Sequence, residues 1–307
     1  MQYLTIEELW EAFSRAYPEH RDWDYTLKAS CDSKVRQFKS HLNSIGFLAG
    51  FTCPGATIIC LISCYTQRGF SHMKPAEMVK AKNTFTLFHY LMEEDAEGLV
   101  DQFSKLITHS TAQYHRRVKK LQKANRTPEE SKELKKMLRA GPLFRWEWAG
   151  DVVNDLHAQT ILDAAHKHPE TNLWIYTRSF HTLPVFDHKP DNLVVWLSSD
   201  EENEQEVDRQ LSRYKWAKKA HMTPKETYKK KVHVNKSDRP EVVCPENTGQ
   251  IPIDGACPSC FICPSVTVKD VDLVFLSEDK GIGRSTIDDE LMELFEEKRG
   301  PLEHAYD

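Results

Sequence analysis

The sequence of 307 residues lacks several patterns that would place it in a common class of protein. No apolar run approaches the length of a membrane span, so we expect the chain to have no membrane contact. No cleavable signal is expected at its start, because the first ten residues already carry charges and a helical apolar spacing. These two absences predict a protein of the cytoplasm.

Motifs for common nucleotide and zinc-hydrolase chemistry are also missing. There is no Walker loop, no Gly-x-Gly-x-x-Gly fingerprint and no histidine pair flanking a glutamate on one helical turn. His157, His166 and His168 are expected on the surface of a helix. The sequence has no internal repeat and no low-complexity segment. It therefore gives no reason to expect a P-loop hydrolase, a dinucleotide-binding enzyme or a zinc protease.

The sequence does contain eight cysteines, seven of which fall into two groups. The three-cysteine group is Cys53, Cys60 and Cys64, and the four-cysteine group is Cys244, Cys257, Cys260 and Cys263. Clustered thiols in a reducing compartment are typical of metal binding or redox chemistry. A chain of this length can also bury a core without disulfides. Two metal sites are the simplest interpretation.

The four-cysteine group predicts the stronger site. Two residues separate each neighbouring pair in Cys257, Cys260 and Cys263, and a proline follows, so three thiolates can converge while the backbone turns. With Cys244 they close either a [4Fe-4S] cluster or a zinc site. Zinc ribbons usually pair two separate Cys-x-x-Cys knuckles, so the triple spacing favours iron–sulfur over zinc. We expect a structural or electron-conducting role.

The three-cysteine group supplies three thiolates from one short segment. A [4Fe-4S] cluster held by three cysteines leaves one iron open, and an open iron could bind substrate or S-adenosylmethionine. The alternative is that Cys60 and Cys64, one helical turn apart among apolar residues, are simply buried small side chains. Cys53 lies outside that apolar run, which favours metal ligation. Cys31 could supply a fourth ligand.

After residue 140 the sequence alternates between strands and helices. Aromatic and β-branched runs predict strands at residues 143–151, 172–179, 192–198, 231–235, 240–244 and 272–276. A helix over residues 154–168 separates the first two strands, and this order predicts parallel β/α units. We expect an α/β fold: a partial (β/α) barrel with parallel strands, an added helical segment and a cysteine-rich C-terminal metal site.

Three parts are expected along the chain. Residues 1–43 form an N-terminal helical extension, residues 44–276 a barrel-like metal-binding domain, and residues 277–307 an acidic C-terminal helix and tail. The helical stretch at residues 98–140 is predicted to be a basic excursion from the barrel-like domain. Capping boxes, Thr5 with Glu8 and Thr127 with Glu130, mark two helix starts.

In β/α folds the functional residues gather at the carboxyl ends of parallel strands. Here those ends carry five polar side chains that we expect to be catalytic: Asp151, Tyr176, Arg178, Ser198 and Asp200. Arg178 could hold a carboxylate or phosphate in a bidentate fork, and Asp151 could accept a hydrogen bond from a hydroxyl or ammonium. An ion pair between the two, joining neighbouring strands, is the alternative. Gly150 is expected to let a cofactor approach the backbone.

Although the net charge is −5, the sequence contains two basic runs. The first basic run, residues 115–140, carries ten Lys and Arg against three Glu. The second basic run, residues 213–231, carries eight against one, with Tyr214, Trp216 and Tyr228 interleaved. This composition suits phosphate contact and base stacking, so both runs are predicted to contact nucleic acid or nucleotide. The alternative is that they are solvated helix faces.

The short motifs also occur in a distinctive order between residues 45 and 264. In that order they are Cys53-Pro-Gly-Ala56, Cys60, Cys64-Tyr65, Arg68-Gly69, Arg145-Trp146, Gly150-Asp151, Tyr176-Thr-Arg-Ser179, the Val195–Ser198 strand, Cys244-Pro245, Cys257, Cys260 and Cys263. As a set they resemble the bacteriophage "gene product eighty-eight" family. The resemblance implies a phage-encoded protein acting in the cytoplasm of the bacterial host, and it implies no particular reaction.

A more distant similarity is to radical S-adenosylmethionine enzymes. These enzymes place an open three-cysteine cluster near the start of a partial β/α barrel, and some add a cysteine-rich site near the end. Their usual spacing is Cys-x3-Cys-x2-Cys, whereas six and three residues separate the thiols of the three-cysteine group. The similarity implies an iron–sulfur enzyme with radical or redox chemistry. The alternative is a non-enzymatic binding protein, braced by metal, for nucleic acid or a host protein.

Overall fold

The computed structural model describes residues 2–64, 66, 74–123, 125–229, 239–268, 271–277 and 289–299. At its centre is a six-stranded sheet in the order β1-β2-β3-β4-β6-β5, with every neighbouring pair parallel. The strands are β1 (Leu143–Arg145), β2 (Asn172–Thr177), β3 (Leu193–Ser199), β4 (Lys218–Pro224), β5 (Glu241–Val243) and β6 (Asp272–Ser277). The predicted parallel α/β sheet is confirmed. The described strands form an open sheet that ends at β1 and β5, and the strand predicted at residues 231–235 lies outside the described residues.

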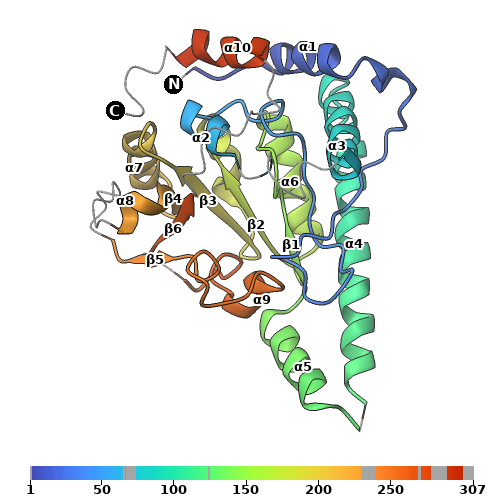
Figure 1. The fold of residues 1–307 in the computed structure, drawn as a ribbon. Coiled ribbons are helices and arrows are strands. Elements are labelled where there is room, and N and C mark those ends of the chain that lie inside the picture. The colour runs from blue at the N-terminus through green and yellow to red at the C-terminus, as the bar shows by residue number, and fades with distance from the viewer. Residues whose placement is uncertain are drawn as a thin grey trace.

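Helices and loops cover both faces of this sheet (Figure 1). The helices are α1 (Ile6–Ala16), η1 (Pro18–Asp22), α2 (Ile58–Ser63), α3 (Lys74–Met92), α4 (Ala96–Leu121), α5 (Pro128–Ala140), α6 (Asp155–Lys167), η4 (Phe180–His188), α7 (Glu204–Arg213), α8 (Lys225–Lys229), α9 (Ala256–Cys260) and α10 (Asp289–Arg299). None of the helices described has the length and apolarity that crossing a membrane requires.

The two faces of the sheet bury different cores. Ile175 in β2 and Val195 in β3 point toward the larger core, which includes residues of α1, α3, α4 and α6. Trp174 and Trp196, their neighbours in sequence, point the other way and pack against three thiols of the four-cysteine group. The pleat of a strand causes this alternation. As a result, the sheet separates the four-cysteine group from the helical core.

Helix starts that were predicted from capping residues are confirmed. The Thr5 hydroxyl accepts a hydrogen bond from the Glu8 amide at 3.3 Å, and the Thr5 amide donates to the Glu8 carboxylate at 2.8 Å. Thr127 and Glu130 form the same pair of bonds at the start of α5. These reciprocal bonds satisfy amide donors that a helix leaves open in its first turn.

Helices α4 and α5 form a hairpin that projects from the body of the molecule (Figure 1). Near its start, α4 contributes Phe103 and Ile107 to the main core. Farther along, the hairpin has a small core of its own: Tyr114, Val118, Leu121, Leu134 and Met137. The hairpin therefore corresponds to the predicted basic excursion, and its first half is anchored in the sheet-bearing body.

The first and last described helices pack on the same core. Phe13 of α1 and both Leu291 and Phe295 of α10 are buried in it. Lys298 Nζ lies 2.8 Å from Glu8 Oε1, which joins the two helices directly. The N-terminal extension and the acidic C-terminal helix thus cover the body instead of standing apart from it.

The prediction that the second basic run contacts nucleic acid is wrong for its central part, which is strand β4. Lys218 Nζ donates to the Ser265 carbonyl oxygen at 2.6 Å. Lys219 Nζ lies 3.0 Å from both Glu204 Oε1 and Asp208 Oδ1, and its side chain is fully buried. Because these ammonium groups face protein partners inside the fold, they cannot contact phosphates.

Reversing the charge of Lys219 should therefore disrupt the fold. In Lys219→Glu a carboxylate would be buried beside Glu204 and Asp208, and we expect a loss of about 3–5 kcal/mol in the free energy of unfolding. The exposed Lys215 is the matched control, and Lys215→Glu should change stability by less than about 0.5 kcal/mol. Urea unfolding curves measure both values. Equal midpoints for the two variants would contradict the buried position of Lys219.

Candidate metal-binding and catalytic site

The three-cysteine group lies at the carboxyl ends of β2 and β3. Cys53 is in the loop before α2, Cys60 is in α2, and Cys64 is the residue that caps its C-terminus. The loop crosses the end of β2 so closely that a Cβ atom at Gly55 would lie 2.2 Å from the Arg178 carbonyl oxygen. Glycine is required here by close contact between two backbone segments.

A buried ion pair ties α2 to the sheet. Arg178 Nη1 lies 2.7 Å from Asp200 Oδ2, and the two side chains are 7% and 1% exposed. The Thr57 hydroxyl donates to the same Asp200 oxygen at 2.6 Å and accepts from the Cys60 amide at 3.0 Å. Glu202 accepts from the first two amides of α2 at 3.1 and 2.8 Å. Both carboxylates thus help to fix the helix that carries Cys60.

Asp151 joins the same site from the loop after β1. Its two carboxylate oxygens accept from the amides of Arg178 and Val152, each at 2.7 Å, and Thr177 adds a side-chain hydrogen bond. Burial raises the pKa of Asp151 to about 6, although these hydrogen bonds act in the opposite direction. Asp151 therefore binds the backbone of Arg178, while the guanidinium group pairs with Asp200.

The three thiols influence one another and the carboxylates around them. Burial raises the pKa of Cys60 to about 12, even though Arg178 lowers it. Burial also raises the pKa of Cys53 well above its usual value, and Asp151 and the other two thiols raise it further. The Gly50 amide donates to Cys53 Sγ at 3.4 Å, a contact that stabilises a thiolate. Without a bound cation, burial therefore keeps Cys53 and Cys60 protonated.

The four-cysteine group converges on the opposite face of the sheet. Cys244 follows β5, Cys257 and Cys260 belong to α9, and Cys263 comes three residues after Cys260. Burial raises the pKa of Cys263 to about 12, and Cys260 and Cys244 raise it further. Trp196 Nε1 donates to the Cys263 carbonyl oxygen at 2.9 Å and so fixes this loop on β3.

Both thiol groups have the donor chemistry of a metal–thiolate centre, because soft thiolate ligands suit iron–sulfur clusters and zinc. Within the described part of the chain, however, no three His, Cys, Asp or Glu side chains are placed so that they could hold a metal ion as they stand. Each thiol group therefore fits a metal in the type of its ligands and in their approach to one another. The ligand side chains would have to change position when a metal binds.

The structure divides the five predicted catalytic residues between the two faces of the sheet. The Tyr176 hydroxyl hydrogen-bonds the Cys263 thiol and so belongs with the four-cysteine group. Ser198 lies on the same side of β3 as Trp196, whereas Thr177 points toward Asp151. Three of the five meet the three-cysteine group: Asp151, Arg178 and Asp200. Residue spacing alone does not reveal this division, because Arg178 and Asp200 follow the last residues of β2 and β3 and so do not obey the alternation of the strands.

Gly150 has a packing role in the structure. Its φ is +92°, a value that favours glycine, and a Cβ atom there would lie 2.5 Å from Thr52 Oγ1 and 2.9 Å from Phe47 Cβ. These contacts account for the glycine through its close packing against the segment that leads to Cys53. Its predicted role in binding a cofactor is not needed to explain it.

The profile of the family described as "Gene product 88" matches residues 21–265. The chain belongs to the gene product 88 family. It is similar to the Gene 88 protein of Mycobacterium phage L5, with 26% identity over 230 residues, which cover 72% of this chain and 82% of that protein. No solved structure matches the chain. The family that the order of motifs indicated is confirmed, and neither the family description nor the name of the phage L5 protein states an activity.

This member of the gene product 88 family also contains a buried acid–histidine pair that the sequence did not reveal. Glu147 has a left-handed backbone with φ 46°, and its Oε1 lies 3.3 Å from His157 Nε2. Both side chains are 0% exposed, so the prediction that His157 lies on the helix surface is wrong. Burial raises the pKa of Glu147 well above its usual value and lowers that of His157 to about 3.

Two further polar residues were not predicted, one near the Arg178–Asp200 pair and one near Cys64. His221 of β4 is buried, with Nδ1 2.7 Å from Ser199 Oγ, and burial lowers its pKa to about 4. Lys80 of α3 is buried, donates to the Thr66 carbonyl oxygen at 3.2 Å and interacts electrostatically with Cys64. Neither has a sequence signal. Thr57 has one, because a threonine before an apolar run is a typical N-cap.

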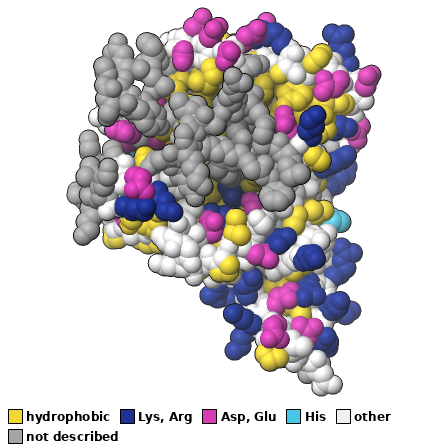
Figure 2. All heavy atoms as spheres, viewed as in Figure 1, with side chains coloured by type: hydrophobic (Ala, Val, Ile, Leu, Met, Phe, Trp, Pro, Cys, Tyr) yellow, Lys and Arg dark blue, Asp and Glu magenta, His cyan; other side chains and the backbone are white. Residues whose placement is uncertain are grey.

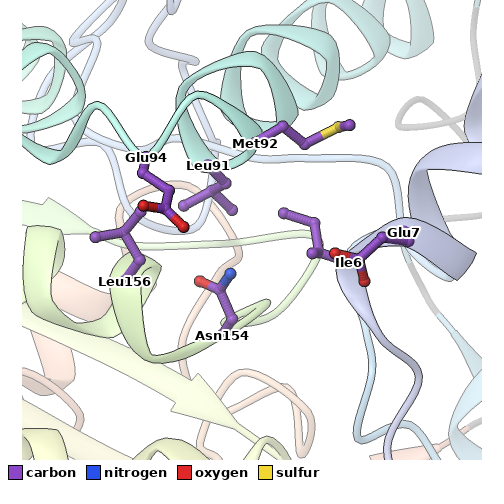
Figure 3. A pocket seen from close by; sticks show the side chains of 7 residues that line it. All are labelled: Ile6, Glu7, Leu91, Met92, Glu94, Asn154 and Leu156. Atoms are coloured by element: carbon purple, nitrogen blue, oxygen red, sulfur yellow. The ribbon is translucent and has the colours of Figure 1, made fainter.

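A cavity in the described part of the chain lies elsewhere. It measures about 400 Å³ and lies between α1, α3 and the start of α6 (Figure 3). Its lining consists of Ile6, Glu7, Leu91, Met92, Glu94, Asn154 and Leu156. None of these is a cysteine or one of the predicted catalytic residues, so this cavity is separate from both thiol groups.

The buried Glu147 should make stability depend on pH. Its pKa in the folded state is raised above the unfolded value, so folding favours the protonated form and stability is lost as pH rises. Glu147→Gln cannot ionise. Its stability minus that of the parent should therefore grow between about pH 4 and pH 8. Urea unfolding across that range measures the difference, and the exposed Glu97→Gln controls for removal of a surface charge. Parallel curves for parent and Glu147→Gln would contradict this account.

Proposed function

We propose that this chain is a phage-encoded iron–sulfur protein that carries out radical or redox chemistry in the cytoplasm of the bacterial host. The observation that carries the proposal is the meeting of the three-cysteine group with Arg178, Asp200 and Asp151 at the ends of parallel strands. Thiols and polar groups at this edge of a sheet are arranged as a reactive centre would require. A packing role for cysteines would not require a buried guanidinium beside them.

In the proposal, each of the residues named at this edge of the sheet has a defined chemical role. The three-cysteine group would hold a [4Fe-4S] cluster with one open iron, which would supply one-electron chemistry and could bind S-adenosylmethionine. Arg178, held by Asp200, would keep a positive charge next to Cys60. Asp151, whose pKa is raised to about 6 by burial, could hold or release a proton near neutral pH.

The four-cysteine group would hold a second [4Fe-4S] cluster, with zinc as the alternative. It lies across the sheet from the three-cysteine group, so in the proposal it serves structure or electron transfer instead of substrate binding. A curved, partial barrel of the parallel strands also remains part of the proposal. This arrangement would parallel the placement of two cysteine-rich sites in radical S-adenosylmethionine enzymes.

Single cysteine variants should separate the two sites. After anaerobic purification, Cys60→Ala should lose one cluster's share of iron and sulfide, and any spectral response to S-adenosylmethionine, yet remain folded. Cys260→Ser should be strongly destabilised, because metal binding in such a loop also contributes folding energy. The exposed Cys31, beside Arg36, is the control, and Cys31→Ala should keep the parent's iron content. Iron analysis, absorption and electron paramagnetic resonance measure these properties.

The results that would overturn the proposal are equally definite. A colourless parent protein with zinc and no iron would exclude the iron–sulfur assignment at both groups. Iron content that is unchanged in Cys60→Ala would exclude the three-cysteine group as a cluster site. A melting temperature of Cys260→Ser equal to that of the parent would show that the fold does not depend on a metal bound at the four-cysteine group.

A second candidate function is binding of nucleic acid by a protein that metal merely braces. The observation in its favour is the projecting hairpin, over which Lys and Arg side chains gather (Figure 2). Exposed basic residues of the first basic run lie on it: Arg116, Lys119, Lys120, Lys123, Arg126, Lys132, Lys135 and Arg139. Lys123 among these is paired with Glu130 at 2.9 Å, but most of the charge faces solvent. Such a projection could follow a phosphate backbone.

Charge reversal on the hairpin tests this second function. The parent should bind a labelled single strand weakly, with affinity that falls steeply as salt rises, because counterions are released. Lys119→Glu, Lys120→Glu and Lys135→Glu together should reduce the slope of log affinity against log salt, by roughly one for each lost phosphate contact. Lys215→Glu is the control for reversal of one exposed charge away from the hairpin. Fluorescence anisotropy across a salt series measures the slopes. Identical slopes in all three proteins would show that the hairpin does not contact the nucleic acid.

A further inference from the structure

Lys34 lies against the four-cysteine group. The Cys257 amide donates to the Lys34 carbonyl oxygen at 2.9 Å, so the two segments run side by side. Lys34 Nζ lies 5.7 Å from the centre of the Phe275 ring, in the aromatic surroundings of the thiols, and 2.5 Å from Glu246 Oε2. The ammonium group acts electrostatically on both Cys244 and Cys257. Only 22% of this side chain is exposed, so its charge is poorly screened by water.

Two arginines approach the same group from other elements. The Arg145 guanidinium stands 5.4 Å from the centre of the Tyr176 ring and favours the thiolate forms of Cys257 and Cys263. Arg139 of α5 donates to the carbonyl oxygens of Pro258 and Ser259, within helix α9, which carries Cys257 and Cys260. The Tyr176 hydroxyl adds a hydrogen bond to Cys263. Three cations and one hydroxyl therefore lie around the four thiols, together with two carboxylates: Glu246 beside Lys34, and Asp32 at 3.6 Å from Arg145.

The surroundings are matched to a negative centre. Three of the thiols are at least nine-tenths buried: Cys244, Cys257 and Cys263. Four thiolates around a zinc ion leave a net charge of about −2, and an oxidised [4Fe-4S] core gives the same sum. Burying such a charge is costly unless opposite charges and hydrogen bonds lie close to it. Neutral thiols would need no such cations.

We propose that Lys34, Arg145 and Arg139, together with the Tyr176 hydroxyl, form a charge-compensating shell around a metal–thiolate centre at the four-cysteine group. The proposal rests on the proposed function only in taking this group as a metal site. The shell residues are not ligands. They position the loop and lower the free energy of the anionic centre, so they determine how tightly metal is held and, for a cluster, how readily it accepts an electron.

The ion pair between Lys34 and Glu246 provides the sharpest test. Lys34→Gln removes a positive charge near the thiols, and Glu246→Gln removes the negative charge that partly cancels it. Both variants break the same ion pair, so a purely structural role would make both of them worse. The shell instead predicts opposite effects: Lys34→Gln should lose metal faster than the parent, and Glu246→Gln should retain it longer.

The experiment uses the full chain with Cys60→Ala, so that only the four-cysteine group can be loaded. Release of iron or zinc to a chelator is followed for Lys34→Gln, Glu246→Gln, the rescue variant Lys34→Arg and the exposed control Lys28→Gln. Loss of an outer-shell partner typically weakens metal binding about 10- to 100-fold, which sets the effect expected for Lys34→Gln. If iron is bound, Lys34→Gln and Tyr176→Phe should both lower the reduction potential of the cluster, and Glu246→Gln should raise it.

The outcomes separate this inference from the proposed function. Opposite shifts on a bound zinc ion would support the shell and would replace the second cluster of the iron–sulfur function by its zinc alternative. Shifts in the same direction on a bound cluster, or none, would overturn the shell and leave that function standing. Failure of the Cys60→Ala chain to retain any metal would overturn the shell, and the proposed function would then depend on the three-cysteine group alone. If Lys28→Gln changed the rate of metal loss as much as Lys34→Gln does, the shell would also be overturned. The effect would then come from the net charge of the protein and not from a charge near the thiols.

Discussion

The placement of the three-cysteine group depends on one buried ion pair, between Arg178 and Asp200. The pair joins the ends of β2 and β3, and the Thr57 hydroxyl connects it to the N-cap of α2. A helix as short as α2 cannot hold its own conformation, so tertiary contacts must orient it. Removing either charge would leave the other uncompensated in the interior, which costs several kcal/mol. The position of Cys60 relative to the sheet therefore follows from this pair.

Strand β2 connects the two thiol groups while keeping them apart. Tyr176 contacts Cys263 on one face, and Thr177 contacts Asp151 on the other. The pleat dictates this division, because successive side chains of a strand leave on opposite sides. One layer of sheet thus lies between three thiols near Asp151, Asp200 and Arg178 and four thiols near Lys34 and Arg145. Two centres in such different surroundings would not be interchangeable, even with the same metal in both.

Local patterns predicted much of this fold, because they are determined by neighbouring residues. The capping boxes at Thr5 and Thr127, the helix after Asn154 and the strands of the parallel sheet are of this kind. Strand β4 was missed because it contains two lysines, and only the partners in space, such as Glu204 for Lys219, make those charges tolerable in a sheet. The site was predicted in part for the same reason. Polar residues at strand ends were found, but the face on which each one lies depends on the register of the strands.

The charges around the thiols distinguish the two groups in a way that their spacing does not. At the three-cysteine group, Asp151 opposes ionisation of both Cys53 and Cys60, and the positive charge of Arg178 is largely taken up by Asp200. Lys80 acts in the opposite direction on Cys64 alone. In the proposed iron–sulfur protein, the surroundings of Cys53 and Cys60 would disfavour added negative charge and would suit a positively charged ligand, such as the sulfonium of S-adenosylmethionine. At the four-cysteine group, Lys34 and Arg145 favour thiolates, and an added electron would be easier to accommodate. In the proposed iron–sulfur protein, electrons would therefore rest more readily at the four-cysteine group, and the three-cysteine group would be the centre at which a bound ligand is reduced.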